Sequence, residues 1–238
     1  MYLSIIFPAY DEEKKIKDDV LRASSFLISE KIDGEIIVVD DGSNDKTFEI
    51  ASDLKSKIKT DLKVIKLVKN FGKGAAIKEG ILTSKGKYVL YSDVGNIVPF
   101  KYALAGIKLL DKIQADVANG SRKLPNSIIA KEQNIDRVIA SNIFNWMIHK
   151  YLKIPNYFTD TQCGFKIYKN EVAKNLFAQL QTNGFLFELE IILRGLKNKL
   201  KIIEFPVEWR CDRDSRISFI KTTPKVLKEI LAIKKMFN

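Results

Sequence analysis

Residues 35–45 read Glu-Ile-Ile-Val-Val-Asp-Asp-Gly-Ser-Asn-Asp, a continuous apolar run that ends abruptly in acidic and small polar residues. A short apolar run bounded by turn residues is typical of a strand buried on both faces of a parallel sheet. Residues 3–13, Leu-Ser-Ile-Ile-Phe-Pro-Ala-Tyr-Asp-Glu-Glu, have the same form. Both stretches therefore predict buried strands that carry polar side chains at their carboxyl ends.

Outward from these two strands, apolar runs alternate with longer amphipathic segments. Strands are predicted at residues 3–8, 35–39, 62–68, 88–91 and 116–119, with helices at 12–29, 45–57, 74–82 and 100–113. The second half is less regular, with a polar loop at 123–136, a helix at 137–152, a turn and strand at 159–168, a helix at 186–196, a strand at 201–205 and a basic amphipathic helix at about 221–237. The alternation predicts an α/β fold with a mostly parallel central sheet flanked by helices. Because no repeat or linker interrupts it, residues 1–238 are interpreted as a single domain.

Composition limits the function classes. The 238 residues are 46% hydrophobic, which is enough for one sizeable core, and the net charge of +11 favours anionic partners. The charge is concentrated in residues 197–238, which hold eleven basic residues and five acidic ones. No apolar run is long enough to span a bilayer, and the N-terminus lacks the features of a signal peptide, so a cytoplasmic location is expected. The lone histidine, His149, and the widely separated Cys163 and Cys211 support neither a hydrolase triad nor a zinc site.

Polar residues follow each of the first four predicted strands, where an open α/β sheet binds its ligands. These segments are residues 8–13, 40–45, 69–74 and 92–96. Asp93 in the fourth segment suits a divalent cation held against a diphosphate. Gly72 and Gly74 permit close backbone approach, and the helix that follows them favours anions at its N-terminus. Each segment alone also fits an ordinary turn or cap, but their joint placement predicts a nucleotide site. The glycine patterns of dinucleotide enzymes and P-loop NTPases are not found.

Six segments carry a resemblance to a known family: IFPAYDEE (6–13), EIIVVDDGS (35–43), GKGAA (72–76), GSR (120–122), DTQCGFK (160–166) and FPVEW (205–209). On these segments the chain resembles family-2 glycosyltransferases of GT-A fold. Within that family it is similar to dolichyl-phosphate glucosyltransferases and the related bacterial polyprenyl-phosphate enzymes. The resemblance runs from residue 3 to about residue 218. It implies inverting transfer of a sugar from a nucleotide-sugar, with a UDP-sugar favoured, to a polyprenyl phosphate.

Matched by position, the resemblance places Pro8, Tyr10 and Glu12 around the nucleoside and Asp41 near the uracil or ribose. Lys73 joins this nucleotide-binding set.

The resemblance also implies a divalent cation, Mg²⁺ or Mn²⁺. Asp93 is the first carboxylate of the family's metal-binding Asp-x-Asp pair, but the second position is Gly95 here. The cation is therefore expected to be weakly held by Asp93, the diphosphate and Asn96. Partial replacement of the cation by Lys and Arg side chains is the alternative.

The acceptor side is expected to be basic. The resemblance places Arg122 near the acceptor or the diphosphate, and Arg213 and Arg216 in a loop that closes over the diphosphate. Surface ion pairing is the alternative for the latter two arginines. Glu190 is expected to face the site and bind the sugar. A lipid phosphate is already anionic at pH 7, so this reaction requires no general base.

Two other functions stay open at this point. A soluble relative that acts on a sugar, protein or small acceptor needs a carboxylate base, for which Glu190 or Asp160 are the candidates. A non-catalytic nucleotide-binding relative is the other, because of Gly95. Nucleic acid is not an expected partner, since no basic-aromatic RNA motif is present.

The predicted helix at 221–237 has an apolar arc and a basic arc. It predicts either a helix packed on the domain with its lysines in water, or an interfacial helix that docks an otherwise cytoplasmic protein on an anionic membrane. Lys221, Lys225, Lys228 and Lys235 are the lysines on which this docking would depend.

Overall fold

The computed structural model describes residues 1–131, 135–210 and 219–237. The strands are β1 (Leu3–Ala9), β2 (Gly34–Asp40), β3 (Asp61–Lys66), β4 (Tyr88–Ser92), β5 (Val117–Ser121), β6 (Ile128–Lys131), β7 (Phe165–Lys169), β8 (Ile202–Pro206) and β9 (Glu208–Arg210). The helices are α1 (Ile16–Ser29), α2 (Thr47–Asp53), α3 (Lys73–Thr83), α4 (Lys101–Lys112), α5 (Ile135–Leu152), α6 (Asn170–Ala178), α7 (Phe187–Lys197) and α8 (Phe219–Phe237), and a short 3₁₀ turn (Leu54–Ser56) follows α2.

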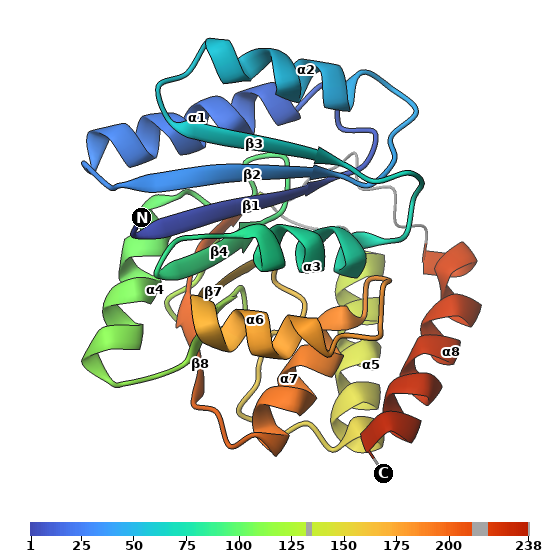
Figure 1. Ribbon diagram of the computed structural model, residues 1–238. Helices are drawn as coiled ribbons and strands as arrows, with labels where there is room; N and C mark the ends of the chain where they lie inside the picture. The colour runs from blue at the N-terminus through green and yellow to red at the C-terminus, as the bar shows by residue number, and fades with distance from the viewer. Residues whose placement is uncertain (132–134, 211–218, 238) are drawn as a thin grey trace.

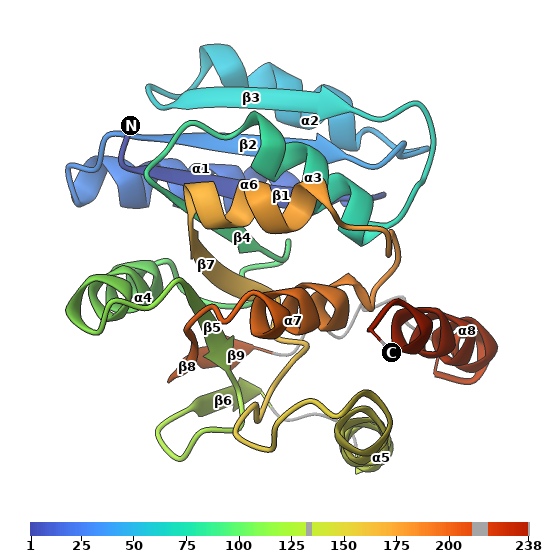
Figure 2. The ribbon, with the colours of Figure 1, turned by 60° about the horizontal axis from the view of Figure 1, so that its bottom comes forward.

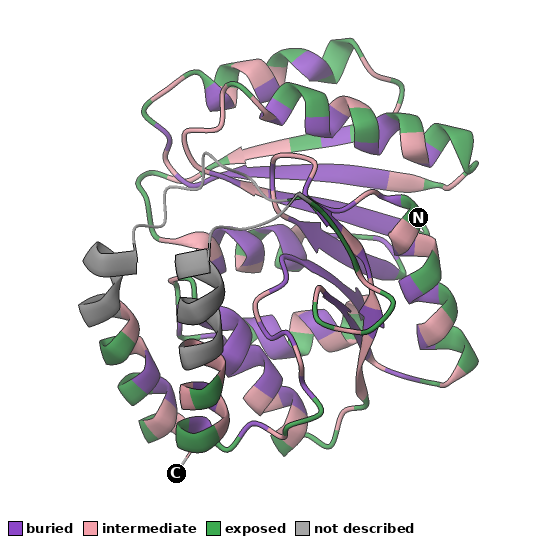
Figure 3. Cartoon of the chain, turned by 180° about the vertical axis from the view of Figure 1, so that it is seen from behind, coloured by how far each residue is buried: buried purple, intermediate pink, exposed green. Residues whose placement is uncertain are grey.

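Seven strands form one central sheet in the order β3-β2-β1-β4-β7-β5-β8 (Figure 1). Every neighbouring pair is parallel except those made by β7, which runs antiparallel to β4 and β5. The predicted mostly parallel α/β sheet is therefore confirmed. Strands β1, β2 and β4 were recognisable as strands because they are buried along almost their whole length, whereas β3 at the edge of the sheet has one buried residue, Leu62 (Figure 3).

Helices cover both faces of the sheet, as Figure 2 shows from below. On one face Val20 of α1, Ala51 of α2 and Ala103 of α4 pack against the strands, and on the other Ile77 of α3, Leu176 of α6 and Phe187 of α7 do so. A third cluster joins α5, α7 and α8 at one end of the molecule. None of the described helices is both long and apolar enough to cross a bilayer.

Two parts of the fold differ from the sequence prediction. Residues 128–131, expected within a polar loop, form strand β6, which pairs in parallel with β9 as a separate two-stranded sheet. Helix α6 follows β7 directly at residues where no helix was predicted. The pairing of β6 depends on a partner about 80 residues away, and such a contact leaves little trace in local sequence.

Candidate active site

The loops that follow β1 and β2 are joined by hydrogen bonds between backbone and side chains. The backbone amide of Asp11 donates to Ser43 Oγ at 2.8 Å, and that of Glu12 donates to Thr47 Oγ1 at 2.7 Å. The Asn44 amide group donates to the hydroxyl of Tyr10 at 3.3 Å. Parallel strands end at the same sheet edge, so these bonds hold Tyr10 and Glu12 beside the Asp40–Ser43 turn. The structure thus brings together two of the predicted nucleoside-binding residues.

Asp41 fixes the next loop. Its buried carboxylate accepts hydrogen bonds from the backbone amides of Phe71 and Gly72, at 2.9 and 2.8 Å. Burial raises the pKa of the Asp41 carboxyl, and the two amide bonds offset part of that effect. Asp41 is therefore a support for the loop before α3, and Pro8 on β1 is paired with Val39, two residues before Asp41.

Lys73 and Asp93 meet at the end of this loop. The Lys73 ammonium lies 2.7 Å from Asp93 Oδ1, and the Asp93 side chain is a third exposed. Burial lowers the pKa of Lys73, but the carboxylates of Asp93 and Glu188 outweigh it and the pKa is raised. The ammonium therefore stays charged at the edge of the sheet. Both Asp41 and Asp93 contact the segment 71–73, so the structure brings these two predicted residues to one loop.

The glycines beside Lys73 have a structural role that the sequence prediction missed. The backbone amides of Gly74 and Ala75 donate to the carbonyl of Asn183, at 2.8 and 3.4 Å. A Cβ atom on Gly72 or Gly74 would collide with the backbone of residues 182–183. The expectation that these glycines and the helix N-terminus lie open to an anion is therefore wrong, because the chain itself occupies this position.

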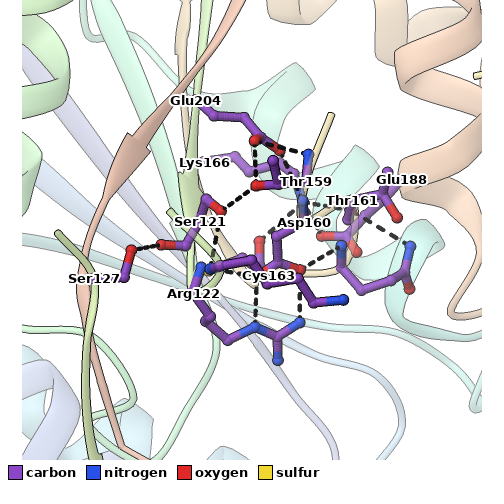
Figure 4. Close-up of polar contacts among 12 residues, drawn as sticks. Ser121, Arg122, Ser127, Thr159, Asp160, Thr161, Cys163, Lys166, Glu188 and Glu204 are labelled. Carbon is purple, nitrogen blue, oxygen red and sulfur yellow. Dashed lines mark hydrogen bonds and ion pairs between the residues drawn. The ribbon is translucent and has the colours of Figure 1, made fainter. Parts of the chain in front are cut away.

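Arg122 is fixed by a bidentate ion pair with Asp160 (Figure 4). Its Nε and Nη2 donate to the two carboxylate oxygens at 2.6 and 2.7 Å. The guanidinium carbon Cζ lies 5.2 Å from the Trp209 ring centroid. Burial alone would raise the pKa of Asp160, but Arg122 lowers it overall. Glu204 in turn accepts the backbone amides of Thr159 and Asp160 at 2.9 Å. Arg122 is consequently a permanent cation with a set orientation.

The segment that follows Asp160 is held by a buried lysine that the sequence analysis did not single out. The Lys166 ammonium donates to the carbonyls of Thr161 and Cys163, at 3.1 and 2.9 Å, and to Glu188 Oε1 at 2.6 Å. The hydroxyl of Tyr91 donates to the same Glu188 oxygen at 2.6 Å. A lysine inside an otherwise apolar strand was the available signal for this network, since unpaired lysines are rarely buried.

Gly164 links the segment that begins at Asp160, the partner of Arg122, to Asp93, the partner of Lys73. The backbone amide of Asp93 donates to its carbonyl at 2.9 Å, and a Cβ atom there would overlap the Asp93 carboxylate. Segment 160–164 therefore runs from the partner of Arg122 to the partner of Lys73.

Glu190 does not belong to the site. Its carboxylate is fully buried, pairs with Arg194 at 2.7 Å and accepts the backbone amides of Gln181 and Thr182. The prediction that Glu190 faces the site is wrong, because these partners take up its carboxylate. Glu188 is the acid of α7 that contacts the site network.

The turn that carries Gly95 and Asn96 is supported from α1. The backbone amides of both residues donate to the buried carboxylate of Asp19, at 2.6 and 2.8 Å. Gly95 and Asn96 both have positive φ, at 109° and 52°, a backbone conformation that favours Gly and tolerates Asn. Burial raises the pKa of Asp19. Asp19 is a supporting residue that the sequence analysis missed, although it is an acid on the buried side of a helix.

Among the described residues no three acidic, histidine or cysteine side chains lie close enough to hold a metal ion. Asp93 is the one carboxylate at the predicted cation position, and Lys73 pairs with it. This donor set suits a hard cation that takes most of its oxygen ligands from a bound diphosphate, as Mg²⁺ commonly does. Arg213 and Arg216 lie outside the described residues.

Residues 4–177 match the model of glycosyl transferase family 2. The dolichyl-phosphate beta-glucosyltransferase of Dictyostelium discoideum is 30% identical over 247 residues, covering 98% of this chain and 74% of the relative. That of Homo sapiens is 33% identical over 218 residues, covering 87% of this chain and 67% of the relative. The chain belongs to glycosyl transferase family 2 and is a glycosyltransferase.

Solved structures agree with the fold. Glucosyl-3-phosphoglycerate synthase of Mycobacterium tuberculosis, crystallised with Mn²⁺, UDP-glucose and phosphoglyceric acid, superposes with a TM-score of 0.74 at 16% identity, covering 100% of this chain and 80% of that one. Another crystal structure of the same enzyme, with Mg²⁺ and UDP, gives a TM-score of 0.72 at 16% identity, covering 98% of this chain and 77% of that one. The predicted GT-A fold is confirmed, and divalent cations occur in these structural neighbours.

Proposed function

We propose that this glycosyltransferase moves a sugar from a nucleotide-sugar, with a UDP-sugar favoured, to a polyprenyl phosphate. The observation that carries the proposal is the pair of fixed cations, Lys73 and Arg122, at the two ends of segment 160–164. Such a reaction has two anionic groups, the donor diphosphate and the acceptor phosphate, and each needs positive charge. The dolichyl-phosphate beta-glucosyltransferase relatives support the same acceptor class.

The proposed reaction is a single displacement with inversion. A phosphate oxygen of the acceptor forms a bond to the anomeric carbon, and the bond from that carbon to the diphosphate oxygen breaks. The acceptor is already ionised, so no proton has to be removed. Arg122 orients the acceptor phosphate, and the Lys73 ammonium stabilises the charge that develops on the departing diphosphate. His149 takes no part, since its Nδ1 contacts the carbonyl of Ile154 at 2.8 Å.

We include a weakly held divalent cation, Mg²⁺ or Mn²⁺, in this proposal. Asp93 and Asn96 are the residues that would hold it, and it would supply electrostatic stabilisation of the diphosphate. Because the described residues offer a single carboxylate at this position, we expect Mn²⁺ to bind the free protein weakly and to bind more tightly when UDP is present. Calorimetry with and without UDP measures this difference. Tight Mn²⁺ binding to the free protein, or full activity in excess chelator, would contradict it.

We further propose that the protein works at the cytoplasmic face of an anionic membrane, where a polyprenyl phosphate resides, and not on nucleic acid. The direct test is incubation with radiolabelled UDP-sugars and polyprenyl phosphate in vesicles, followed by extraction. Label should enter the organic phase with the wild-type chain and be strongly reduced with Arg122→Gln, while UDP affinity in that variant stays close to wild type. Label that never enters the organic phase with any nucleotide-sugar refutes the acceptor assignment.

The alternative hypothesis, transfer to a soluble sugar, protein or small-molecule acceptor, requires a carboxylate base. The two candidate bases are poorly suited to that role. Glu190 is buried in an ion pair, and the lowered pKa of Asp160 makes its carboxylate a weak base. A non-catalytic binding role would be favoured if UDP bound well and no acceptor were ever labelled.

A further inference from the structure

Four large apolar side chains lie exposed on α5 and α8, which pack side by side (Figures 1 and 3). Trp146 and Tyr151 of α5 are 62% and 49% exposed, and Leu227 and Leu231 of α8 are 44% and 59% exposed. We call this surface the α5–α8 face. The exposure does not come from helices lying loosely on the domain, because Ile148, Ile230 and Ile233 of the same helices are buried against α7.

Lysines surround these apolar side chains. The Lys150 ammonium lies 4.9 Å from the Trp146 ring centroid, and that of Lys234 lies 4.4 Å from the Tyr151 ring centroid. Lys228 and Lys235 of α8 are exposed. In the part of the two helices whose side chains the structure describes, the one carboxylate is that of Glu229, and it accepts the backbone amide of Leu186 at 3.3 Å. The α5–α8 face is therefore apolar, aromatic and basic.

We infer that the α5–α8 face docks on the surface of an anionic bilayer. Tryptophan and tyrosine place an apolar ring and a polar edge at the lipid headgroup level, and lysines extend toward the anionic headgroups. The charge also argues against a second copy as the occupant, because self-association would set lysines against lysines. This inference rests on the proposed function, because docking serves catalysis only if the acceptor is a polyprenyl phosphate in the membrane.

A single loop connects this face to the site. The carbonyl of Asn183 accepts the first amides of α3, directly after Lys73, while Leu186 at the other end of the loop is bonded to Glu229 of α8. Gly184 packs so closely on Glu229 that a Cβ atom there would overlap its carboxylate. The loop of residues 183–186 therefore links the Lys73 end of the site directly to the docking helix α8.

The sequence prediction named only the C-terminal helix and its lysines. The structure adds the aromatic side chains of α5 and reassigns the apolar arc of α8, whose buried part packs on the domain while Leu227 and Leu231 remain outside. The side chains of Lys221 and Lys225 lie outside the described residues, so the docking inference uses neither.

Vesicle co-sedimentation tests the inference. The wild-type chain should bind vesicles of phosphatidylglycerol and phosphatidylcholine, be released by salt, and bind phosphatidylcholine alone poorly. Lys228→Gln with Lys235→Gln should weaken binding about 30-fold, since each lysine near an anionic surface contributes about fivefold. Trp146→Ser with Leu231→Ser should weaken it about tenfold or more. The matched controls are Lys55→Gln with Lys57→Gln and Ile28→Ser, exposed positions elsewhere on the molecule, which should bind like wild type.

Tryptophan fluorescence tests the inference in the wild-type chain, with one conservative variant as its control. The chain has two tryptophans, and Trp209 is 7% exposed while Trp146 is 62% exposed. Anionic vesicles should shift the emission to shorter wavelength, brominated lipids should quench it, and Trp146→Phe should abolish both effects while binding persists. Absence of quenching in a chain that co-sediments would show that another surface docks.

The failure of this inference can be told apart from failure of the proposed function. With a short-chain, water-soluble polyprenyl phosphate, the face variants should transfer sugar at the wild-type rate, and with the long-chain acceptor in vesicles they should lose most activity. Equal binding to neutral and anionic vesicles, or none to either, overturns the docking inference. So does a change of oligomeric state in the face variants, which would assign the surface to a second copy. Vesicle binding without transfer to either acceptor would instead overturn the proposed function alone.

Discussion

Lys166→Met is the substitution whose effect follows most directly from the structure. Lys166 and Glu188 are 1% and 2% exposed, and their charged groups lie 2.6 Å apart. Removing the ammonium leaves the Glu188 carboxylate buried with the hydrogen bond from the Tyr91 hydroxyl, and it takes the donor from the carbonyls of Thr161 and Cys163. Breaking one partner out of a buried pair typically costs about 3–5 kcal/mol.

A loss of this size would be a large fraction of the total stability of a domain, which is about 5–15 kcal/mol. Urea unfolding followed by far-ultraviolet circular dichroism measures it, with exposed Lys55→Met as the matched control. Adding Glu188→Leu to Lys166→Met should recover much of the loss, because the uncompensated charge is then gone, and the double-mutant cycle should give a coupling above about 2 kcal/mol. A cost below about 1 kcal/mol for Lys166→Met, or no recovery in the double variant, would refute the view that this ion pair supports segment 160–164.

Three further predictions concern carboxylates that hold loops at the site. Asp41→Ala removes the acceptor of the Phe71 and Gly72 amides and should weaken UDP binding by about 1–3 kcal/mol; unchanged affinity by calorimetry would remove Asp41 from the site. The pKa of Asp160 is lowered in the folded chain, so the stability it contributes is present above the unfolded value of about 3.9 and is lost as pH falls through the folded value. Thermal melts across the acid range should therefore show a shallower loss in Asp160→Asn than in wild type, and identical slopes would argue against the ion pair with Arg122. Asp19→Ala leaves the amides of Gly95 and Asn96 without their acceptor and should destabilise the fold by about 1–3 kcal/mol; a melting temperature equal to that of wild type would show that water replaces the carboxylate.

The first half of the fold was predictable because local sequence and tertiary role agree there. Strands β1, β2 and β4 are short apolar runs that end at turns, and they are buried on both faces. Strand β6 was not predictable in the same way. Its residues 128 and 129 are largely exposed, and its strand character comes from pairing with β9, far along the chain.

The site was predictable as a location more than as a set of roles. Sequence order placed Tyr10, Asp41 and Asp93 at successive strand ends, and the structure connects their loops. The sequence did not distinguish Glu188 from Glu190, because both lie in the first turn of α7. Only packing decides which of the two contacts Lys166. Asp19 and Lys166 left a readable signal, since each is a charged residue in an apolar setting and so needs a buried partner.

Three carboxylates around the site, two of them buried, each hold a loop through backbone amides, which explains the sign of the charge that remains there. Asp19 and Asp41 each accept two backbone amides of a neighbouring loop, and Glu204 accepts the amides of Thr159 and Asp160. A carboxylate engaged in this way fixes the loop and has few lone pairs left for a ligand. Among the described residues, the cations Lys73 and Arg122 each form an ion pair with one acid, which takes up only part of their donor groups. The acids thus fix the loops before substrate binds, and the two cations between the loops are already oriented. Little rearrangement is then required when negative charge develops on the leaving diphosphate. This arrangement favours two phosphate-bearing substrates over a neutral acceptor.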